Sequence, residues 1–522
     1  MARWKSQVLL VVIALAFVAG GMLFVPRLGI EVDEAIVTSG IYDHGNPWYS
    51  WKFDGSELPI MILSYLGALK AWLYNGLFLF VPPRPIALRL PMLLLAAGTL
   101  WLFFELLDRT MGRKAAWIGT LLLATDTSYL LLNTADYGPV TLQFVFKLAA
   151  LLLLVRFHKN GSKQELAWAF ALVGLALWDK AVFAWVLFGL AVAAAAVFPG
   201  DIRRHLNRTN VLVACSAMLA GALPLVIYNI ARPLETLQSN VRVEQRAIVG
   251  KADVLRTTMD GSVMFGFMTA AEPGPIPGQA NHWYQKLSIA ASRLTGHPRH
   301  GAMLIIAAAC ALSIIFLWKS TLRKPILFGV IASAGTWLPM VLTAGAGAAA
   351  QHVILLWPFH LIPIAAVLSQ LSGLRAAIVT TLLCGSNLLV TNQYYADLVV
   401  NGPAIRWTDA MDPLQRYLAD SHARRIVAAD WGFFETMNLL SEGELQMYYA
   451  DTSSDQAIEA MLRDPVNLFV THAKGVAFHP QERALLEAVA QREQYQQELL
   501  TTILDRNGRP AFDVFRFRKL HL

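Results

Sequence analysis

The chain carries acidic residues in places where a membrane makes them costly. The pair Asp33-Glu34 directly follows the first hydrophobic segment, and the same outer segment carries Asp54 and Glu57. Asp136 stands in a short turn between two further apolar segments. An ionised carboxylate loses hydration energy beside a bilayer, so each of these groups needs a reason to be there. The chemistry that suits them is general acid/base catalysis on a substrate that arrives within the lipid.

Each of these carboxylates also has a structural interpretation. Asp33 and Glu34 could be solvated charges of a loop, and Asp54 could be an ordinary turn residue before a glycine. Glu57 and Asp136 stand shortly before a proline, where a carboxylate often caps the helix that follows. The sequence leaves both interpretations open for every member of the group.

Three residues could supply a complementary positive charge. Lys180 stands in a tight turn between two apolar segments, Arg89 begins another, and His352 lies near the end of a third. A fixed cation stabilises a phosphate as it leaves with extra charge. The alternatives are an ion pair of Lys180 with Asp179 and a snorkelling Arg89. Carboxylates and cations together favour an enzyme that uses a lipid-borne phosphate, and the sequence has no GxxxxGKS or GxxxxGKT loop for a cytosolic nucleotide.

The elements that must position these groups are membrane-spanning helices. The chain has 522 residues, of which 56% are apolar and only 15% are charged, and its mean hydropathy is +0.47. In soluble domains about a quarter of the residues are charged. Several apolar segments here are long enough to cross a hydrocarbon core of about 30 Å. We therefore predict an α-helical polytopic membrane protein, and the composition excludes a soluble one.

The net charge of +7 comes with Lys and Arg concentrated in short loops between the apolar segments. This distribution sets the membrane topology and gives no reason to expect a nucleic-acid partner. Cys215, Cys310 and Cys384 lie within apolar segments and form neither a disulfide framework nor a zinc-binding pattern. The first apolar segment lacks a small-residue cleavage site, so we predict that it remains as the first span.

Keeping the basic loops in the cytoplasm predicts about eleven spans. The segment 59–81 is long enough to cross, but counting it would move every later basic loop outside, so we assign it to interfacial helices. An odd number of spans places the C-terminal region outside, with the outer loops 27–86 and 232–299. The predicted spans are 7–26, 87–107, 115–133, 139–156, 165–180, 182–199, 210–230, 301–318, 325–345, 352–370 and 374–394.

The last part of the chain has the composition of a small soluble domain, which divides the protein into 1–398 and 399–522. Alternating strands and helices predict an extracytoplasmic α/β domain. The domain could position an acceptor or could stabilise the fold, and the loop 232–299 is a candidate mobile lid. The predicted strands are 425–429, 467–471 and 512–517, and the predicted helices are 412–419 and 482–498.

Several short motifs share their order with a known group of membrane enzymes. They are Val32-Asp33-Glu34-Ala35, Phe53–Met61, Ala87–Pro91, Ala135–Pro139, Trp178-Asp179-Lys180 and His352–Pro358. Over about residues 30–400 the chain resembles the GT-C superfamily of integral membrane glycosyltransferases. It is most similar to bacterial enzymes of the protein mannosyltransferase and aminoarabinose transferase kind. It departs from them at Leu58, where a Lys is expected, near His352, where an Arg is expected, and after Pro91, where a Ser is missing.

The resemblance implies transfer of a sugar from a polyprenyl-phosphate donor, with inversion, on the outer face of a bacterial inner membrane. The acceptor would be a lipid, a glycan or a protein. Asp33 would be the general base or would orient the acceptor. Some members of the group bind a divalent metal and others do not, so a divalent cation stays open and we assign no metal ligand. The implied catalytic residues are Asp33, Glu57 and Asp136, and the implied substrate-binding residues are Glu34, Asp54, Arg89, Lys180 and His352.

Two other classes of protein also fit a polytopic chain. A secondary transporter or flippase places ionisable groups near the bilayer midplane, often in two related halves. Here the acidic groups gather at one face and no internal repeat occurs. A membrane-anchored assembly protein would use its C-terminal domain for recognition. Loss of sugar transfer in an Asp33→Asn variant, but not on deletion of residues 400–522, would reject the assembly protein.

Overall fold

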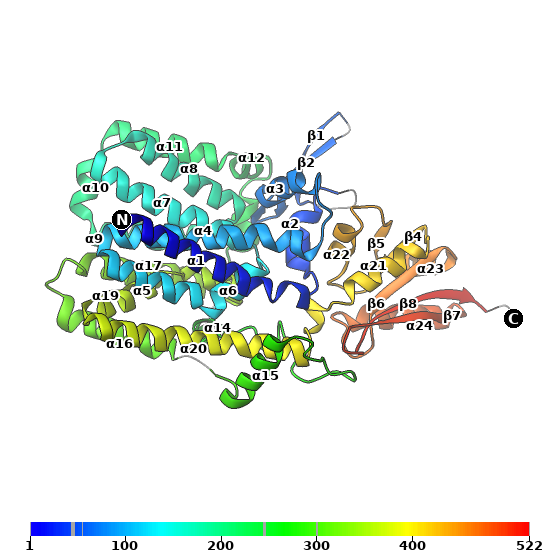
Figure 1. Ribbon diagram of the computed structural model, residues 1–522. Helices are drawn as coiled ribbons and strands as arrows, with labels where there is room; N and C mark the ends of the chain where they lie inside the picture. The colour runs from blue at the N-terminus through cyan, green and yellow to red at the C-terminus, as the bar shows by residue number, and fades with distance from the viewer. Residues whose placement is uncertain (1, 43–46, 55, 244–246, 299–300, 521–522) are drawn as a thin grey trace.

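Long apolar segments of this chain form helices, because a backbone inside a bilayer must satisfy its own hydrogen bonds. In the computed structural model these helices form a bundle, and an α/β part lies at one end of it (Figure 1). The amino end of the first helix lies at the opposite end of the bundle (Figure 1). The structure describes residues 2–42, 47–54, 56–243, 247–298 and 301–520.

The bundle contains long helices and helices that are broken into two parts. Its first half consists of α1 (Ala2–Met22), α4 (Pro85–Met111), α5 (Arg113–Thr125), α6 (Thr127–Thr134), α7 (Thr141–Asn160), α8 (Lys163–Asp179), α9 (Phe183–Val197), α10 (Pro199–His205), α11 (Arg208–Gly221) and α12 (Leu223–Ala231). Its second half consists of α16 (Ala302–Leu317), α17 (Arg323–Leu342), α18 (Ala350–Val353), η2 (Ile354–Leu356), α19 (Leu361–Gln370) and α20 (Gly373–Val400).

All eleven predicted spans coincide with helices. Fewer of these helices are long and apolar enough to cross a membrane on their own. Among the described residues five helices are long and apolar enough to cross a membrane, or up to nine if each of four bent pairs is one span. The bends measure 57° between α5 and α6, 99° between α9 and α10, and 69° between α11 and α12. The segment from α18 to η2 meets α19 at 41°. The two remaining segments are shorter, with 17 residues in α8 and 16 in α16.

The outer segment between α1 and α4 begins with a helix where the sequence analysis expected a loop. After the short turn η1 (Val25–Arg27), α2 extends over Val32–Ser39. Glu31 caps this helix: its side chain accepts a hydrogen bond from the backbone, and Glu34 reaches back to the backbone N–H of Glu31. This reciprocal capping fixes the first turn, which carries Asp33.

A small antiparallel sheet follows, and it corrects the prediction of interfacial helices over 59–81. The prediction is right for α3 but wrong for the residues before it, which form β2 and β3. Ile60, Met61 and Ile62 are all buried, and a short apolar run of this kind does not distinguish a strand from a buried helix by its periodicity. The elements are β1 (Tyr49–Phe53), β2 (Ser56–Leu63), β3 (Leu66–Gly67) and α3 (Leu69–Phe78).

The α/β part contains a five-stranded sheet with the order β5-β4-β6-β8-β7. β4 is parallel to β5 and β6, while β8 is antiparallel to β6 and β7. The elements are η3 (Ile405–Trp407), α21 (Met411–Asp420), β4 (Arg425–Ala428), α22 (Phe434–Leu440), β5 (Met447–Tyr449), α23 (Asp455–Arg463), β6 (Asn467–His472), α24 (Pro480–Arg492), β7 (Tyr495–Leu504) and β8 (Pro510–Lys519).

The three predicted strands of this part are present, and two further strands are new. The helix predicted to residue 498 ends at Arg492, and β7 begins at Tyr495. This stretch is rich in Glu and Gln, which favour helix, but pairing with β8 overrides that weak preference. Within its described residues the long loop 232–299 contains three helices, α13 (Glu235–Asn240), α14 (Ile248–Met259) and α15 (Trp283–Thr295).

One hydrophobic cluster joins the bundle to the α/β part. Its members from the membrane half include Ile30 before α2 and Leu88 of α4, and those from the other half include Leu414 of α21 and Met437 of α22. All four side chains are buried. The two halves of the chain therefore share a core at the end of the bundle where α2 and α3 lie (Figure 1).

Candidate active site

The first turn of α2 is held by a buried ion pair from α4. The guanidinium of Arg89 binds Glu34 through two contacts, Nε to Oε1 at 2.8 Å and Nη2 to Oε2 at 2.6 Å. Both side chains are buried. Arg89 also donates to three backbone carbonyls, those of Val25 at 3.1 Å, Leu28 at 2.8 Å and Gly29 at 2.6 Å.

These contacts bear on the predicted substrate-binding roles of Arg89 and Glu34. A guanidinium has five N–H donors, and the five contacts of Arg89 use all of them. No donor is left for a phosphate in this arrangement, and both oxygens of Glu34 bind the guanidinium. We infer that the pair positions α2, and that binding of the donor phosphate falls to other cations.

Unlike Glu34 and Asp136, Asp33 has an available carboxylate. Its side chain is partly exposed, and its backbone N–H donates to Glu31 Oε2 at 2.6 Å. Among the described residues its carboxylate forms no hydrogen bond and no ion pair. Burial raises the pKa of Asp33, and the positive charges of Lys180 and Arg406 lower it in part. Such a carboxylate suits a base that must exchange a proton with a substrate.

Lys180 follows α8 and, with Glu31, Asp33 and Arg406, belongs to a group of charged residues that we call the Asp33 cluster. Its side chain is only 2% exposed, and its ammonium donates to the carbonyl of Gly138. An antiparallel bridge with Leu66 ties its backbone to β3. The alternative of an ion pair with Asp179 is not what forms, because Asp179 accepts a hydrogen bond from Gln143 at 2.6 Å. The structure thus places two predicted residues, Asp33 and Lys180, near enough for the charge of Lys180 to lower the pKa of Asp33.

Asp136 is buried, and both of its oxygens are engaged. Oδ1 accepts from the backbone N–H groups of Val140 at 2.9 Å and Thr141 at 2.8 Å, at the start of α7. Oδ2 binds the ammonium of Lys70 from α3 at 2.7 Å. The capping alternative is therefore what the structure shows. The predicted catalytic role stays a prediction, and the geometry favours a positioning role.

The turn after Asp136 depends on a glycine. Gly138 has a φ of +68°, and a Cβ added there would lie 2.3 Å from the side chain of Gln351. This close approach places α18 beside the turn that Lys180 binds. His352, the next residue, is partly buried. Its predicted contact with the donor phosphate stays a prediction.

Glu57 and Asp54 lie away from this cluster, on the β1–β2 hairpin that projects from the end of the bundle (Figure 1). Glu57 pairs with Lys52 across the hairpin at 2.8 Å, and the two side chains are 52% and 79% exposed. Asp54 follows β1 in the turn with a φ of +31°. Neither carboxylate contacts the Asp33 cluster through a hydrogen bond or ion pair among the described residues. Their catalytic and binding roles stay predictions.

Two residues of the Asp33 cluster, Glu31 and Arg406, were not predicted from the sequence. Glu31 is buried, and the guanidinium of Arg406 in η3 lies 3.6 Å from its Oε1. Burial and the negative charge of Asp33 raise the pKa of Glu31 well above its ordinary value. The spacing Glu31-x-Asp33-Glu34 was visible in the sequence and could have marked Glu31. Nothing in the sequence connected Arg406 to it.

The α/β part also faces Asp33 through α22. Glu435, in the first turn of that helix, accepts a hydrogen bond from Tyr449 at 2.6 Å. Burial raises the pKa of Glu435, and the nearby charge of Asp33 adds to the effect. The hydroxyl of Thr436 donates to the carbonyl of Ile30. The candidate site is therefore enclosed from both halves of the chain.

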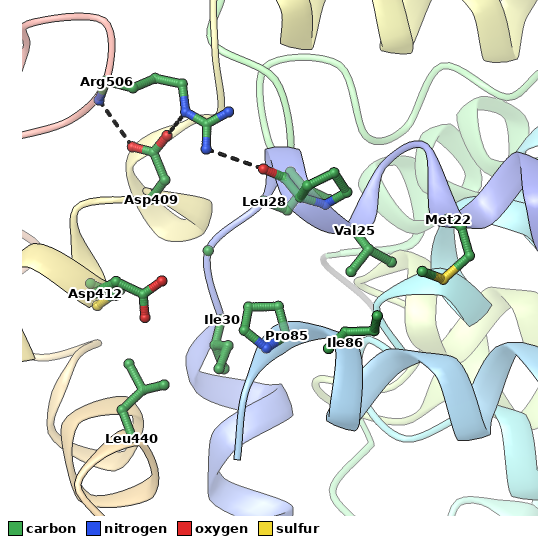
Figure 2. A pocket seen from close by; sticks show the side chains of 13 residues that line it. Met22, Val25, Leu28, Ile30, Pro85, Ile86, Asp409, Asp412, Leu440 and Arg506 are labelled. Atoms are coloured by element: carbon green, nitrogen blue, oxygen red, sulfur yellow. Dashed lines mark hydrogen bonds and ion pairs between the residues drawn. The ribbon is translucent and has the colours of Figure 1, made fainter. Parts of the chain in front are cut away.

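A separate cavity of about 410 Å³ lies at the junction of the two halves (Figure 2). Apolar residues from the end of α1 and the start of α4 line it, with Asp409, Asp412 and Arg506 from the α/β part. Arg506 pairs with Asp409 and donates to the carbonyl of Pro26 at 3.1 Å. This cavity contains none of the predicted site residues, so we place the chemistry at the Asp33 cluster.

A metal site needs several ligands that converge on one point. In the described ranges no three His, Cys, Asp or Glu side chains converge as a metal site would require. We therefore assign no metal ligand.

A bundle of apolar helices, with a carboxylate and cations gathered at the end that adjoins an α/β part, defines a polytopic membrane protein. Residues 68–228 match the family model of dolichyl-phosphate-mannose-protein mannosyltransferases. No curated protein matches the chain.

Two crystal structures of ArnT from Cupriavidus metallidurans share the fold. The form bound to undecaprenyl phosphate matches with a TM-score of 0.59 and 12% identity, over 98% of each chain. The apo form matches with a TM-score of 0.55 and 13% identity, again over 98% of each chain. The matched segment and the shared fold agree with the resemblance to integral membrane glycosyltransferases that the motifs indicated.

Proposed function

We propose that this protein transfers a sugar from a polyprenyl-phosphate donor, with inversion, to an acceptor on the outer face of a bacterial inner membrane. The observation that carries the proposal is the free, partly exposed carboxylate of Asp33 beside the positive charges of Lys180 and Arg406. The shared fold of a protein that binds undecaprenyl phosphate supports the donor class. The α/β part would then lie on the periplasmic side.

In the proposed reaction the acceptor nucleophile attacks the anomeric carbon of the sugar. The bond from that carbon to the phosphate oxygen breaks as the new bond forms on the opposite face, which inverts the configuration. Asp33 takes the proton of the nucleophile. The polyprenyl phosphate leaves with the electron pair, and the ammonium of Lys180 stabilises its added negative charge.

The remaining buried charges hold these groups in place. The Arg89–Glu34 pair fixes the first turn of α2 and therefore Asp33. The Lys70–Asp136 pair fixes α3 against the start of α7, next to the turn that Lys180 binds. Groups oriented in advance need little reorganisation when charge develops in the transition state.

The test of this function is a comparison of envelope lipids, glycans and proteins from cells with and without the protein, by mass spectrometry. We expect one class of molecule to lose a mass equal to one sugar when the protein is absent, which would identify the sugar and the acceptor together. A flippase would change the distribution of a lipid-linked sugar between the leaflets without removing a sugar from any final acceptor. Unchanged masses would contradict the proposal.

The pH dependence of transfer provides a second test. A base works in its deprotonated form, so kcat/KM should fall as the pH decreases through the pKa of Asp33. Because burial raises that pKa, the midpoint of the acid limb should lie above the ordinary value of about 4. Arg406→Gln should move the midpoint higher still, because Arg406 lowers the pKa of Asp33. A profile that stays flat down to pH 4 would contradict Asp33 as the base.

A further inference from the structure

Arg406 occupies an unusual position between the two halves of the chain. It lies in η3, which connects α20 to the α/β part. The central carbon of its guanidinium is 5.0 Å from the ring centres of Trp431 and Phe478 and 5.5 Å from that of Phe267. Two of these rings belong to the α/β part, and the third belongs to the loop 232–299.

The donors of this guanidinium are not used by the protein. Among the described residues Arg406 makes no hydrogen bond, and its ion pair with Glu31 is loose, at 3.6 Å. One third of its side chain is exposed. The contrast with Arg89 is sharp, because all five donors of Arg89 are engaged. Aromatic faces hold the plane of a guanidinium and leave its N–H edges free to bind an anion.

The location of Arg406 connects it to the reacting groups. Its partner Glu31 accepts the backbone N–H of Asp33 through Oε2 at 2.6 Å. The other oxygen of Glu31, Oε1, is buried and has no hydrogen-bond partner in the described structure. Glu31 and Arg406 thus lie beside Asp33. Among the described residues neither Oε1 of Glu31 nor the guanidinium of Arg406 forms a hydrogen bond.

We infer that Arg406 binds the phosphate of the lipid-linked donor, with two N–H groups of its guanidinium on two phosphate oxygens. The inference rests on the proposed function and adds the residue that holds the donor. A planar guanidinium matches phosphate oxygens in this two-point geometry. The ion pair with Glu31 is loose, at 3.6 Å, so an incoming phosphate can compete with that carboxylate for the guanidinium.

This assignment gives the α/β part a role in donor binding. Trp431 and Phe478 set the position of the guanidinium, so the domain would contribute to the phosphate site through its aromatic rings. Phe267 would link the loop 232–299 to the same site. The predicted roles of the domain, positioning an acceptor or stabilising the fold, do not include this contact with the donor.

The test measures binding of undecaprenyl phosphate to the full-length protein in lipid nanodiscs. We expect Arg406→Ala to weaken binding about tenfold or more, as the loss of charge-assisted hydrogen bonds does, and Arg406→Lys to weaken it less. Arg425→Ala is the matched control. Arg425 belongs to the same domain, stands at the start of β4, and stacks on the ring of Tyr448 in β5. Its binding should equal that of the wild type.

Glu31→Gln separates a binding role from a structural one. If Arg406 serves only as the partner of Glu31, both substitutions break the same pair and should weaken binding alike. If Arg406 binds phosphate, Glu31→Gln removes a competing negative charge while its amide oxygen still caps α2, so binding should be retained or strengthened. This variant decides the question even if Arg406→Ala fails to fold.

The outcomes distinguish the two proposals. Equal affinity of the wild type and Arg406→Ala would overturn the role of Arg406 and leave the proposed function standing. Weaker binding by Glu31→Gln, to the level of Arg406→Ala, would also overturn it. A wild-type protein that does not bind undecaprenyl phosphate would overturn the donor class and the role of Arg406 together.

Discussion

Asn in place of Asp33 should lower kcat/KM for sugar transfer by about a thousandfold, within the range of about 10² to 10⁴ that a positioned general base contributes. The amide has nearly the same shape as the carboxylate but cannot accept the proton of the nucleophile. Asp33 has no partner in the described structure that the substitution would break. The measurement is transfer by the purified protein in nanodiscs, with donor and acceptor identified by mass spectrometry.

The matched control for this substitution is Asp412→Asn. Asp412 is half exposed at the same end of the bundle, and its ion contact with Arg84 is long, at 3.9 Å. We expect its transfer rate to be within twofold of the wild type. Undecaprenyl phosphate should still bind to the Asp33→Asn variant, since the loss concerns the chemical step. Normal transfer by Asp33→Asn would contradict our assignment of the base.

The second large effect is expected on stability. Arg89→Leu should lower the free energy of unfolding by about 3–5 kcal/mol, because it leaves the buried carboxylate of Glu34 without its partner. It also removes the donor of three backbone carbonyls. Equilibrium unfolding in detergent micelles, followed by tryptophan fluorescence, would measure the change.

Two further variants make this stability test specific. In Arg89→Leu/Glu34→Leu no unpaired charge remains, so the double variant should recover part of the loss. Arg84→Ala removes an exposed Arg at the start of the same helix, where ion pairs contribute little, and should change the free energy of unfolding by less than about 1 kcal/mol. If Arg89→Leu were as stable as the wild type, the buried pair would not hold α2.

The membrane half of the fold was largely predictable because its physics is simple. A bilayer forces long apolar segments into helices, and every predicted span coincides with one. The wrong predictions of secondary structure lie outside the predicted spans, where a bilayer no longer forces the backbone into a helix. Ile60–Ile62 lie outside the predicted spans, where an apolar run can form a strand as readily as a helix. After Arg492, pairing with β8 decides the structure, and no local pattern reveals a partner strand.

The sequence predicted on which side of the membrane the site residues lie, but not which of them form ion pairs with one another. Topology places Asp33, Lys180 and Asp136 on one side of the membrane, and the structure brings the first two together. Sequence could not show that Arg89 turns inward to Glu34, because a charge at a helix start looks the same whether it binds a substrate or a neighbour. Arg406 comes close to Glu31 only through the packing of the whole α/β part on the bundle, a long-range contact that one sequence does not encode visibly.

The shared core has a consequence for how substrates reach the site. Rotation of the α/β part away from the bundle as a rigid body would expose side chains such as Ile30, Leu88, Leu414 and Met437 to water. Each Å² of apolar surface exposed in this way costs about 25 cal/mol, so a hinge opening between the two halves is expensive. A substrate that reaches the proposed site without such an opening would enter sideways from the bilayer or past smaller segments, such as the β1–β2 hairpin and the loop that carries Phe267. The junction between the two halves is therefore expected to stay closed, and access to the site is expected at its edges.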